Sequence, residues 1–256
     1  MRSGRGTISI DLGGTAYEAD LAAGLDITIP VRLSGAGVRA FHIPAPAGIP
    51  IEGGTFVGDV RRSGSCNCEE IRFTPHGNGT HTECLGHLTA ERITILTEWT
   101  PQILPAALIT VDPTVLGSDL VVTAAALSFA LPATPVPAVV IRTAPNTPAK
   151  LGKDYSGTNP PYLAPDAAAL LAERGIEHLL VDLPSLDRED DGGRLLAHRA
   201  FWEWPANPRY GCTVTELIYV PDEVPDGLYL LDLQVAPLES DAAPSRPILY
   251  PLRECR

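Results

Sequence analysis

A helix followed directly by a strand, within residues 165–182, is the feature that most constrains the fold of this chain. Pro165 suits the first position of a helix, and Asp166 suits the positive end of the helix dipole. Apolar residues recur with helical spacing over the following turns, and Gly175 is a natural helix stop. The apolar run 178–182 follows at once. This helix-then-strand unit predicts an α/β fold.

Short runs rich in Val, Ile, Leu, Thr and Tyr dominate the rest of the chain, and Pro, Gly or Asp bounds most of them. The 25 prolines are spread along the sequence, which indicates many loops and sheet edges. We therefore expect a mixed sheet or barrel with few helices, in a single domain over residues 1–256. The expected strands are 7–12, 26–33, 70–74, 138–143, 178–182, 213–220 and 227–235.

Charge and hydropathy narrow the expected partners. The formal net charge is -12, and the densest basic pair, Arg61–Arg62, is too small for a phosphate-binding patch, so we expect no nucleic-acid partner. The first residues are charged but lack the apolar core of a signal peptide. The longest apolar run, 120–131, is too short and too interrupted to span a membrane. These observations predict a cytoplasmic protein with no membrane partner.

The five cysteines are an odd number, and with no secretory signal we expect reduced thiols. Cys66 and Cys68 could form a metal half-site, but one intervening residue is tight for zinc, which favours two to four. Cys84 offers a different chemistry, a thiol nucleophile, because His87 lies three residues away. Metal binding explains the neighbouring histidines better than a thiol does.

Three of the six histidines lie within residues 76–87, and Glu83 lies among them. Imidazole nitrogens and a carboxylate are typical ligands of a divalent metal. Glycines at 77 and 79 permit a tight turn that could bring His76 and His81 together. His81 and Glu83 are two residues apart, so an extended segment points both to one side. The pattern predicts a metal site, and the alternative is a histidine-rich surface loop.

The same segment resembles the signature of the metal-dependent cyclase family, which includes the bacterial kynurenine formamidases. That signature is His-x-Gly-Thr-His-x-Asp-x-Pro-x-His. Four residues match it in register: Gly79, Thr80, His81 and His87. Glu83 stands in place of the family's Asp, and Leu85 in place of its Pro. Gly77 falls at the position of the first His, while His76 lies one residue earlier.

Two later segments are also similar to this family, in the same order along the chain. The run 181–187 contains Asp-Leu-Pro-Ser-Leu-Asp and is followed by His198, where the family has Asp-x-Pro-Ser-x-Asp and then a metal-binding His. Residues 215–217 resemble the strand that carries the family's late Glu ligand, which places that role on Glu216. Without the resemblance, His198 could be an ordinary surface residue, and Glu216 could lie on a solvated strand face.

The resemblance implies a strand-rich α/β fold with few helices, the cyclase-like swivelling β/β/α domain. It also implies a homodimer or homotetramer that hydrolyses a small amide or formamide, similar to N-formylkynurenine. One or two divalent ions would be bound per chain, and zinc suits the ligands best, although manganese also tolerates them. The implied ligands are His76, His81, Glu83, His198 and Glu216, with the Glu83 carboxylate bridging two metals.

His87 corresponds to the family's catalytic His, and we expect it to carry the proton that the leaving amine needs. It could instead be another metal ligand. Two other functions stay open: ring opening or closure of a lactam or lactone at the same site, and a metal-free binding protein on the same fold. Asp182 and Asp187 could serve a turn or the site, Phe41 could lie near the substrate, and His42 and His178 are background.

Overall fold

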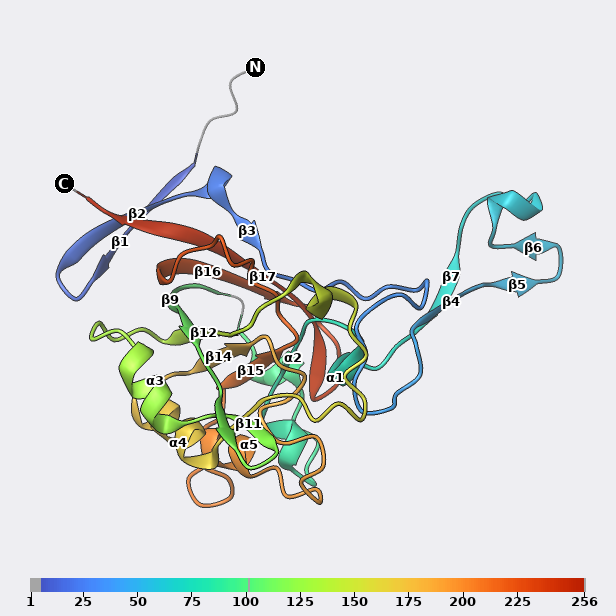
Figure 1. Ribbon diagram of the computed structural model, residues 1–256. Coiled ribbons are helices and arrows are strands. Elements are labelled where there is room, and N and C mark those ends of the chain that lie inside the picture. Colours follow the sequence, from blue (N-terminus) through green and yellow to red (C-terminus); the bar gives the residue numbers. More distant parts are fainter. Residues whose placement is uncertain (1–5, 101, 256) are drawn as a thin grey trace.

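A mixed β-sheet that closes on itself forms the body of the protein in a computed structural model, which describes residues 6–100 and 102–255 (Figure 1). Within these residues, seven strands form the closed ring, because β8 pairs with β15 on one side and with β17 on the other. The ring order is β17 (Ala242–Glu254), β16 (Gly227–Val235), β9 (Gln102–Val111), β12 (Ala138–Thr143), β14 (His178–Val181), β15 (Thr213–Glu216) and β8 (His81–Glu83).

The four central strands β9, β12, β14 and β15 run parallel, and the other ring strands pair antiparallel with their neighbours. A hairpin of β1 (Thr7–Leu12) and β2 (Thr15–Asp20) extends the sheet beyond β17, which also pairs with β3 (Leu25–Asp26). A small second sheet contains β10 (Thr114–Leu116), β11 (Asp119–Val122) and β13 (Tyr162–Leu163). The fold is thus the strand-rich α/β type expected, with a mixed barrel at its centre.

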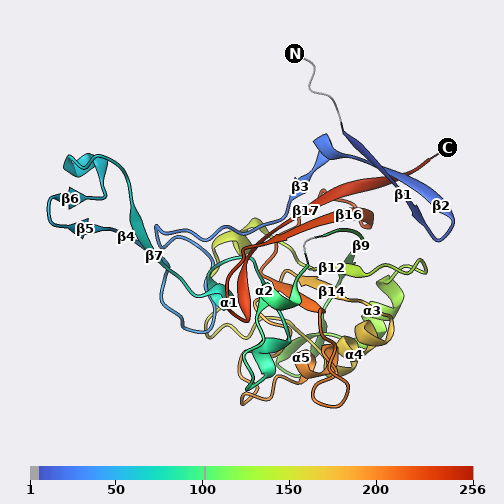
Figure 2. The ribbon, with the colours of Figure 1, turned by 180° about the vertical axis from the view of Figure 1, so that it is seen from behind.

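Few helices accompany these strands. The α-helices are α1 (Pro75–Asn78), α2 (Ile95–Glu98), α3 (Ala124–Ala130), α4 (Pro165–Glu173) and α5 (Leu196–Phe201). Short 3-10 turns lie at Leu21–Ala23, Val60–Arg62, Leu85–Leu88 and Pro148–Gly152. Figure 2 shows α3, α4 and α5 together on one side of the barrel. Across the described residues, every helix is too short or too polar to cross a membrane.

Both faces of the parallel strands are buried, and alternate residues of each strand join different parts of the core. Val139 of β12 and Leu179 of β14 pack with Leu171 of α4, on the side that the helices cover. Val140 and Leu180, one residue further on, pack instead with the apolar residues of β16 and β17. The parallel strands are therefore held rigidly from both sides, which gives the residues that follow their carboxyl ends a fixed position.

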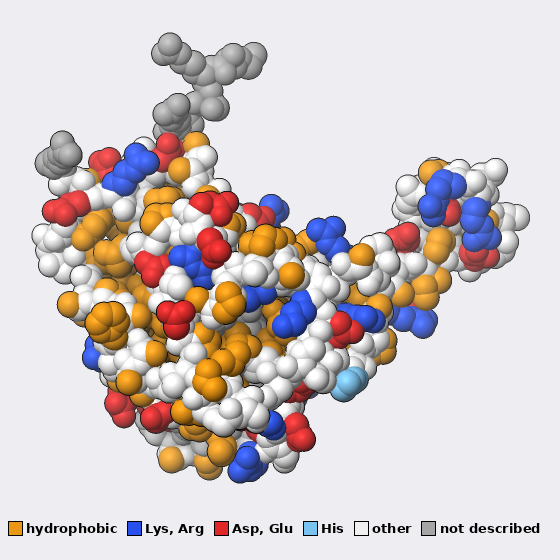
Figure 3. All heavy atoms as spheres, in the orientation of Figure 1, with side chains coloured by type: hydrophobic (Ala, Val, Ile, Leu, Met, Phe, Trp, Pro, Cys, Tyr) orange, Lys and Arg blue, Asp and Glu red, His pale blue; other side chains and the backbone are white. Residues whose placement is uncertain are grey.

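An arm projects from this body, as Figures 1 and 2 show. It contains β4 (Ala47–Pro50), β5 (Glu52–Gly53), β6 (Phe56–Val57) and β7 (Glu69–Arg72), paired as two short antiparallel ribbons. Figure 3 shows that Lys and Arg side chains on the visible face of the molecule are interspersed with acidic ones. Several large apolar side chains of the arm are exposed to solvent: Ile49, Ile51, Phe56, Val60 and Ile71.

The structure corrects two of the expected strands. Within 26–33, only Asp26 belongs to a strand, because the Thr28 N–H bonds the Asp26 side chain at 3.0 Å and Pro30 has no N–H to donate. The strand expected over 213–220 ends at Glu216, since Leu217 adopts a left-handed conformation with φ 55°. The strands at 7–12, 138–143 and 227–235 and the helix from Pro165 are confirmed.

Two long strands were not anticipated, and both contain proline. β9 includes Pro105, and β17 includes Pro244, Pro247 and Pro251. Proline lacks the N–H that a sheet ladder needs, so its presence argues against a strand in sequence analysis. Here the register nevertheless continues through these positions, with Pro105 opposite Leu230. Hydrogen bonding of the other residues to the neighbouring strands outweighs the loss of one backbone N–H donor at each proline.

We predict that the double-sided packing of β14 is a main source of stability. Leu180→Ala should lower the free energy of unfolding by about 2–5 kcal/mol, because the truncation leaves a cavity in the barrel interior. The matched control is Leu116→Ala on β10, which removes the same atoms from an exposed side chain and should cost less than about 0.5 kcal/mol. Urea unfolding of both variants checks this, and equal losses would contradict it.

Candidate metal centre

Pairing between β8 and β15 brings the first two candidate ligands together. In the antiparallel register, Glu216 lies opposite His81, and Thr215 lies opposite Thr82. Residues opposite each other share a face of the sheet, so the imidazole and the carboxylate point the same way. His81 Nε2 lies 3.4 Å from Glu216 Oε2, and both side chains are buried. A hydrogen bond of 2.8 Å between the two threonine hydroxyls supports this register.

His76 reaches the same cluster from α1, which begins at Pro75. Its Nδ1 lies 3.0 Å from Glu83 Oε2, and its ring centroid lies 5.3 Å from that of His81. A side chain at Gly77 would have its Cβ 2.6 Å from Ile43 Cδ1 and 3.2 Å from the Ala40 carbonyl oxygen, so a larger residue here would require the Ile43 side chain to move. The turn expected between His76 and His81 is present.

His198 lies on α5, far along the chain, and is 1% exposed. Its Nδ1 bonds Asp187 Oδ2 at 2.6 Å, which leaves Nε2 directed at Glu83 Oε1, 3.0 Å away. Asp187 also accepts the backbone N–H groups of Ala197 and His198, so it holds the start of α5 and the imidazole together. The alternative that His198 is an ordinary surface residue is wrong, and Asp187 serves this site.

Glu83 is the centre of the cluster. Its Oε2 faces His76, and its Oε1 faces His198, so one carboxylate separates two sets of nitrogens. Four buried atoms of the cluster have ion-pair contacts but no aligned hydrogen bond: His81 Nε2, both Glu83 oxygens and His198 Nε2. Buried polar atoms normally have partners, and a divalent metal is a suitable partner for this donor set. The residues present therefore fit a metal in three overlapping groups, which are His76, His81 and Glu83, then Glu83, His198 and Glu216, and then His76, His87 and Asp241.

The pKa values show how strongly the cluster attracts positive charge. Burial alone would raise the pKa of Glu83, but the facing imidazoles of His87 and His198 hold it well below its usual range. Burial lowers the pKa of His76, yet its contacts with the Asp241 and Glu83 carboxylates outweigh burial and raise it to about 10. The pKa of His198 is raised for the same kind of reason, against burial, by Glu83 and Asp187. A bound cation would take the place of these protons.

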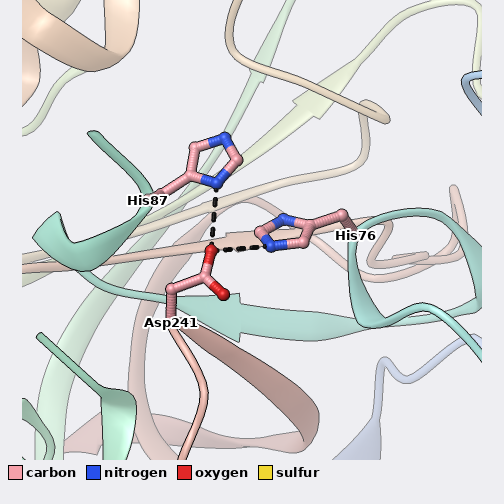
Figure 4. A group of neighbouring side chains, drawn as sticks. All are labelled: His76, His87 and Asp241. Atoms are coloured by element: carbon pink, nitrogen blue, oxygen red, sulfur yellow. Dashed lines mark hydrogen bonds and ion pairs between the residues drawn. The ribbon is translucent and has the colours of Figure 1, made fainter. Parts of the chain in front are cut away.

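Asp241 is a site residue that the sequence analysis missed. Its Oδ2 lies 2.9 Å from His76 Nε2 and 3.1 Å from His87 Nδ1, so it contacts both imidazoles (Figure 4). These hydrogen bonds hold the pKa of the Asp241 carboxyl far below its usual value. His87 Nδ1 is also 3.9 Å from Glu83 Oε2. No motif marks residue 241, and its neighbours, which are mainly Ala, Pro and Ser, give no signal of a site residue.

A cavity of about 210 Å³ opens onto the cluster. Phe41 is part of its wall, as expected, and charged residues of both signs surround the entrance. The lining residues are Phe41, His76, Glu83, His87, Ser185, Arg188, Glu189, Asp191, Leu195, His198 and Glu216. The volume suits a small molecule with a reacting group that reaches Glu83 and His87.

The remaining candidates lie elsewhere or have other roles. Asp182 is buried and bonds Thr143 and Lys150, so it serves the fold. Cys84 is buried, and burial raises the pKa of its thiol to about 12, which disfavours the thiolate that a nucleophile needs. Cys66 and Cys68 are exposed on the arm, away from the cluster. Glu216 is 3% exposed, so the solvated-face alternative is wrong for it.

The fold and this site define a strand-rich α/β barrel with a buried histidine and carboxylate cluster that could bind a divalent metal. The chain belongs to the family described as "Putative cyclase", whose model matches residues 19–188. That match includes His76, His81, Glu83 and His87. It ends before His198, Glu216 and Asp241, which the tertiary structure adds to the same place.

Among curated proteins, the chain is similar to the kynurenine formamidase of Bacillus mycoides (strain KBAB4). The two are 36% identical over 93 residues, which is 36% of this chain and 41% of that protein. The chain therefore matches less than half the length of this relative. Kynurenine formamidase of Bacillus cereus (strain ZK / E33L) shows 34% identity over the same length.

Solved structures share the fold over nearly the whole chain. A predicted metal-dependent hydrolase from Bacillus stearothermophilus matches with a TM-score of 0.59 and 20% identity, covering 89% of this chain and 97% of that one. An isatin hydrolase bound to the product analogue thioisatinate matches with a TM-score of 0.59 and 16% identity, covering 90% and 92%. At these identities the likeness establishes the fold alone.

We predict that the protein, purified without chelator, contains at least one transition metal ion per chain. His198→Ala and Glu216→Gln should lower the bound metal while circular dichroism stays unchanged. Stability should fall with the metal, because 100-fold excess over Kd stabilises a native state by about 2.7 kcal/mol. His42→Ala is the matched control and should keep its metal, since His42 lies outside the cluster. Full occupancy in both ligand variants, by elemental analysis, would contradict the assignment.

Proposed function

We propose that the chain is a metal-dependent hydrolase of a small amide or formamide, of the arylformamidase type, with an N-formylkynurenine-like substrate. The observation that carries this proposal is the Glu83 carboxylate, which is buried and faces a different imidazole with each oxygen. Membership of the cyclase family and the partial match to kynurenine formamidase support the reaction class.

The proposed roles follow from position. His76, His81, Glu83, His198 and Glu216 would hold the metal, with Glu83 shared by the first two groups of ligands. A bound divalent metal would polarise the scissile carbonyl and lower the pKa of a water molecule to about 7. Zinc suits nitrogen and carboxylate ligands, and manganese tolerates them. The cavity would hold the substrate against Glu83 and His87.

Hydrolysis of an amide also needs a proton on the leaving nitrogen, and we assign its delivery to His87. This imidazole lines the cavity and is 26% exposed, whereas the His198 side chain, which also lines the cavity, is 2% exposed and His81 is buried. An ordinary imidazole titrates near neutral pH, so it can both accept a proton from water and donate one to the amine. The products are then the carboxylic acid and the free amine.

A second candidate reaction keeps the site and opens a cyclic amide or lactone. The observation that favours it is the structural likeness to isatin hydrolase over 90% of this chain. The alternative that is not an enzyme is a binding protein that holds no metal. The buried cluster counts against that alternative, because four of its atoms have ion-pair contacts but no aligned hydrogen bond, and buried polar atoms normally have one.

A substrate panel distinguishes these functions. We predict that the metal-loaded protein hydrolyses N-formylkynurenine and simple formanilides with a higher kcat/KM than isatin or aryl lactones, because the matched kynurenine formamidase is 36% identical over 93 residues, whereas the isatin hydrolase is 16% identical. Product formation followed by liquid chromatography measures this, with Glu83→Gln protein as the inactive control. Preference for cyclic substrates would favour ring opening, and turnover of none of them by metal-loaded protein would reject the proposed substrates.

The role of His87 has its own prediction. As a proton carrier, His87→Ala should keep its metal and lose about 10²–10⁴ in kcat, the usual size of general acid–base catalysis. The measurements are elemental analysis and steady-state kinetics, with His42→Ala as the control. If His87 is a ligand, metal content and activity should fall in parallel. Retained metal with unchanged kcat would reject both roles.

A further inference from the structure

We propose that Asp241 is a positioning residue that fixes the orientation and tautomer of His76 and His87 at once. A single carboxylate oxygen contacts both rings, at 2.9 Å from His76 Nε2 and 3.1 Å from His87 Nδ1 (Figure 4). The consequence for activity rests on the proposed function, but the consequence for the imidazoles does not.

Closure of the barrel puts Asp241 in this place. The residue lies directly before β17, and the next residue, Ala242, is paired with Glu83 of β8. The Asp241 carbonyl also accepts the Cys84 N–H at 3.0 Å, so its backbone is tied to the residue after Glu83. Its second carboxylate oxygen accepts the Ser240 hydroxyl at 3.2 Å. The carboxylate is thus held on both sides and cannot easily turn away.

An ionised carboxylate only accepts hydrogen bonds, so each nitrogen facing Asp241 must carry a hydrogen. For His76, that nitrogen is Nε2, which leaves Nδ1 to face Glu83 Oε2 at 3.0 Å. In the neutral ring, the Nδ1 lone pair then points at a carboxylate oxygen and needs a cation between them. Asp241 therefore prepares His76 to bind a metal through Nδ1. Carboxylates that accept from ligand imidazoles act in this way in metal sites generally.

For His87 the same oxygen contacts the other nitrogen, Nδ1. The hydrogen is held there, and Nε2 becomes the atom that can exchange a proton. Because the His87 side chain lines the cavity, a fixed ring presents one defined nitrogen to a substrate. One carboxylate thus couples a ring assigned to the metal with a ring assigned to proton transfer, and their centroids are 4.5 Å apart.

The first test uses nuclear magnetic resonance of ¹⁵N-labelled imidazoles in metal-free and zinc-loaded protein, with no substrate. We expect His76 to carry its hydrogen on Nε2 with zinc bound, and His87 to carry its hydrogen on Nδ1. In Asp241→Asn, at least one ring should lose this preference, because an amide oxygen accepts more weakly than a carboxylate oxygen and the amide NH2 group is a donor. Asp26→Asn, which removes a carboxylate bonded to Arg246 and Thr28, is the matched control and should leave both tautomers unchanged. Unchanged tautomers in Asp241→Asn would overturn the proposal.

The second test asks whether Asp241 acts through the two histidines. Asp241→Asn should weaken zinc binding about 10–100-fold and lower kcat by a similar factor with KM unchanged, the usual effect of removing such a partner. The effect of Asp241→Asn on zinc affinity should disappear in a His76→Ala background. Its effect on kcat should disappear in a His87→Ala background. Asp241→Glu should recover part of both, since it keeps an acceptor carboxylate.

Three results would overturn the proposal. Equal effects of Asp241→Asn in the wild-type and histidine-variant backgrounds would show that Asp241 acts independently of them. Complete loss of one zinc ion in Asp241→Asn would make Asp241 a ligand. Zinc affinity and kcat within twofold of the wild type would leave it no role. If the wild-type protein hydrolyses none of the panel, the proposed substrate fails, while the tautomers and the zinc affinity still decide the role of Asp241.

Discussion

The burial of the Glu83 carboxylate among imidazoles is the interaction on which the rest of the site depends. An isolated buried charge is costly, so this carboxylate requires positive charge next to it. Protons on His76 and His198 supply it when no cation is bound, which is why the pKa values of both rings are raised. A divalent metal satisfies the same requirement and also the nitrogens that lack an aligned hydrogen bond. The need of the buried Glu83 carboxylate for positive charge therefore explains both the raised pKa values of the two histidines and the fit of the cluster to a metal.

The three-residue strand β8 positions this carboxylate, and it does so because it is paired on both sides. β15 supplies Glu216 opposite His81, and Asp241 directly precedes β17, whose first residue, Ala242, lies opposite Glu83. The helices on the outer face support the parallel strands, and α5 delivers His198 from the same layer. Residues more than 150 positions apart thus meet because the sheet closes into a ring.

Local geometry made part of this site predictable. Alternation along an extended segment places His81 and Glu83 on one side, and the turn before them brings His76 close. His198 came only from the resemblance to a family, because nothing in its own surroundings distinguishes a ligand from an ordinary polar residue. Glu216 came from the same resemblance and from its place in an apolar strand, where a carboxylate needs a partner. β9 and β17 escaped prediction since their prolines argue against strands, and pairing with neighbours outweighs that argument.

The sequence by itself determined the helix from Pro165, several of the strands, and the grouping of His76, His81 and Glu83, because these follow from backbone periodicity over a few residues. Only the tertiary structure decided that Asp241 contacts two imidazoles and which nitrogen of each ring stays available. Such contacts depend on how β8 and β17 are aligned when the barrel closes. A slip of one residue would turn each side chain to the opposite face, and no local pattern encodes that alignment.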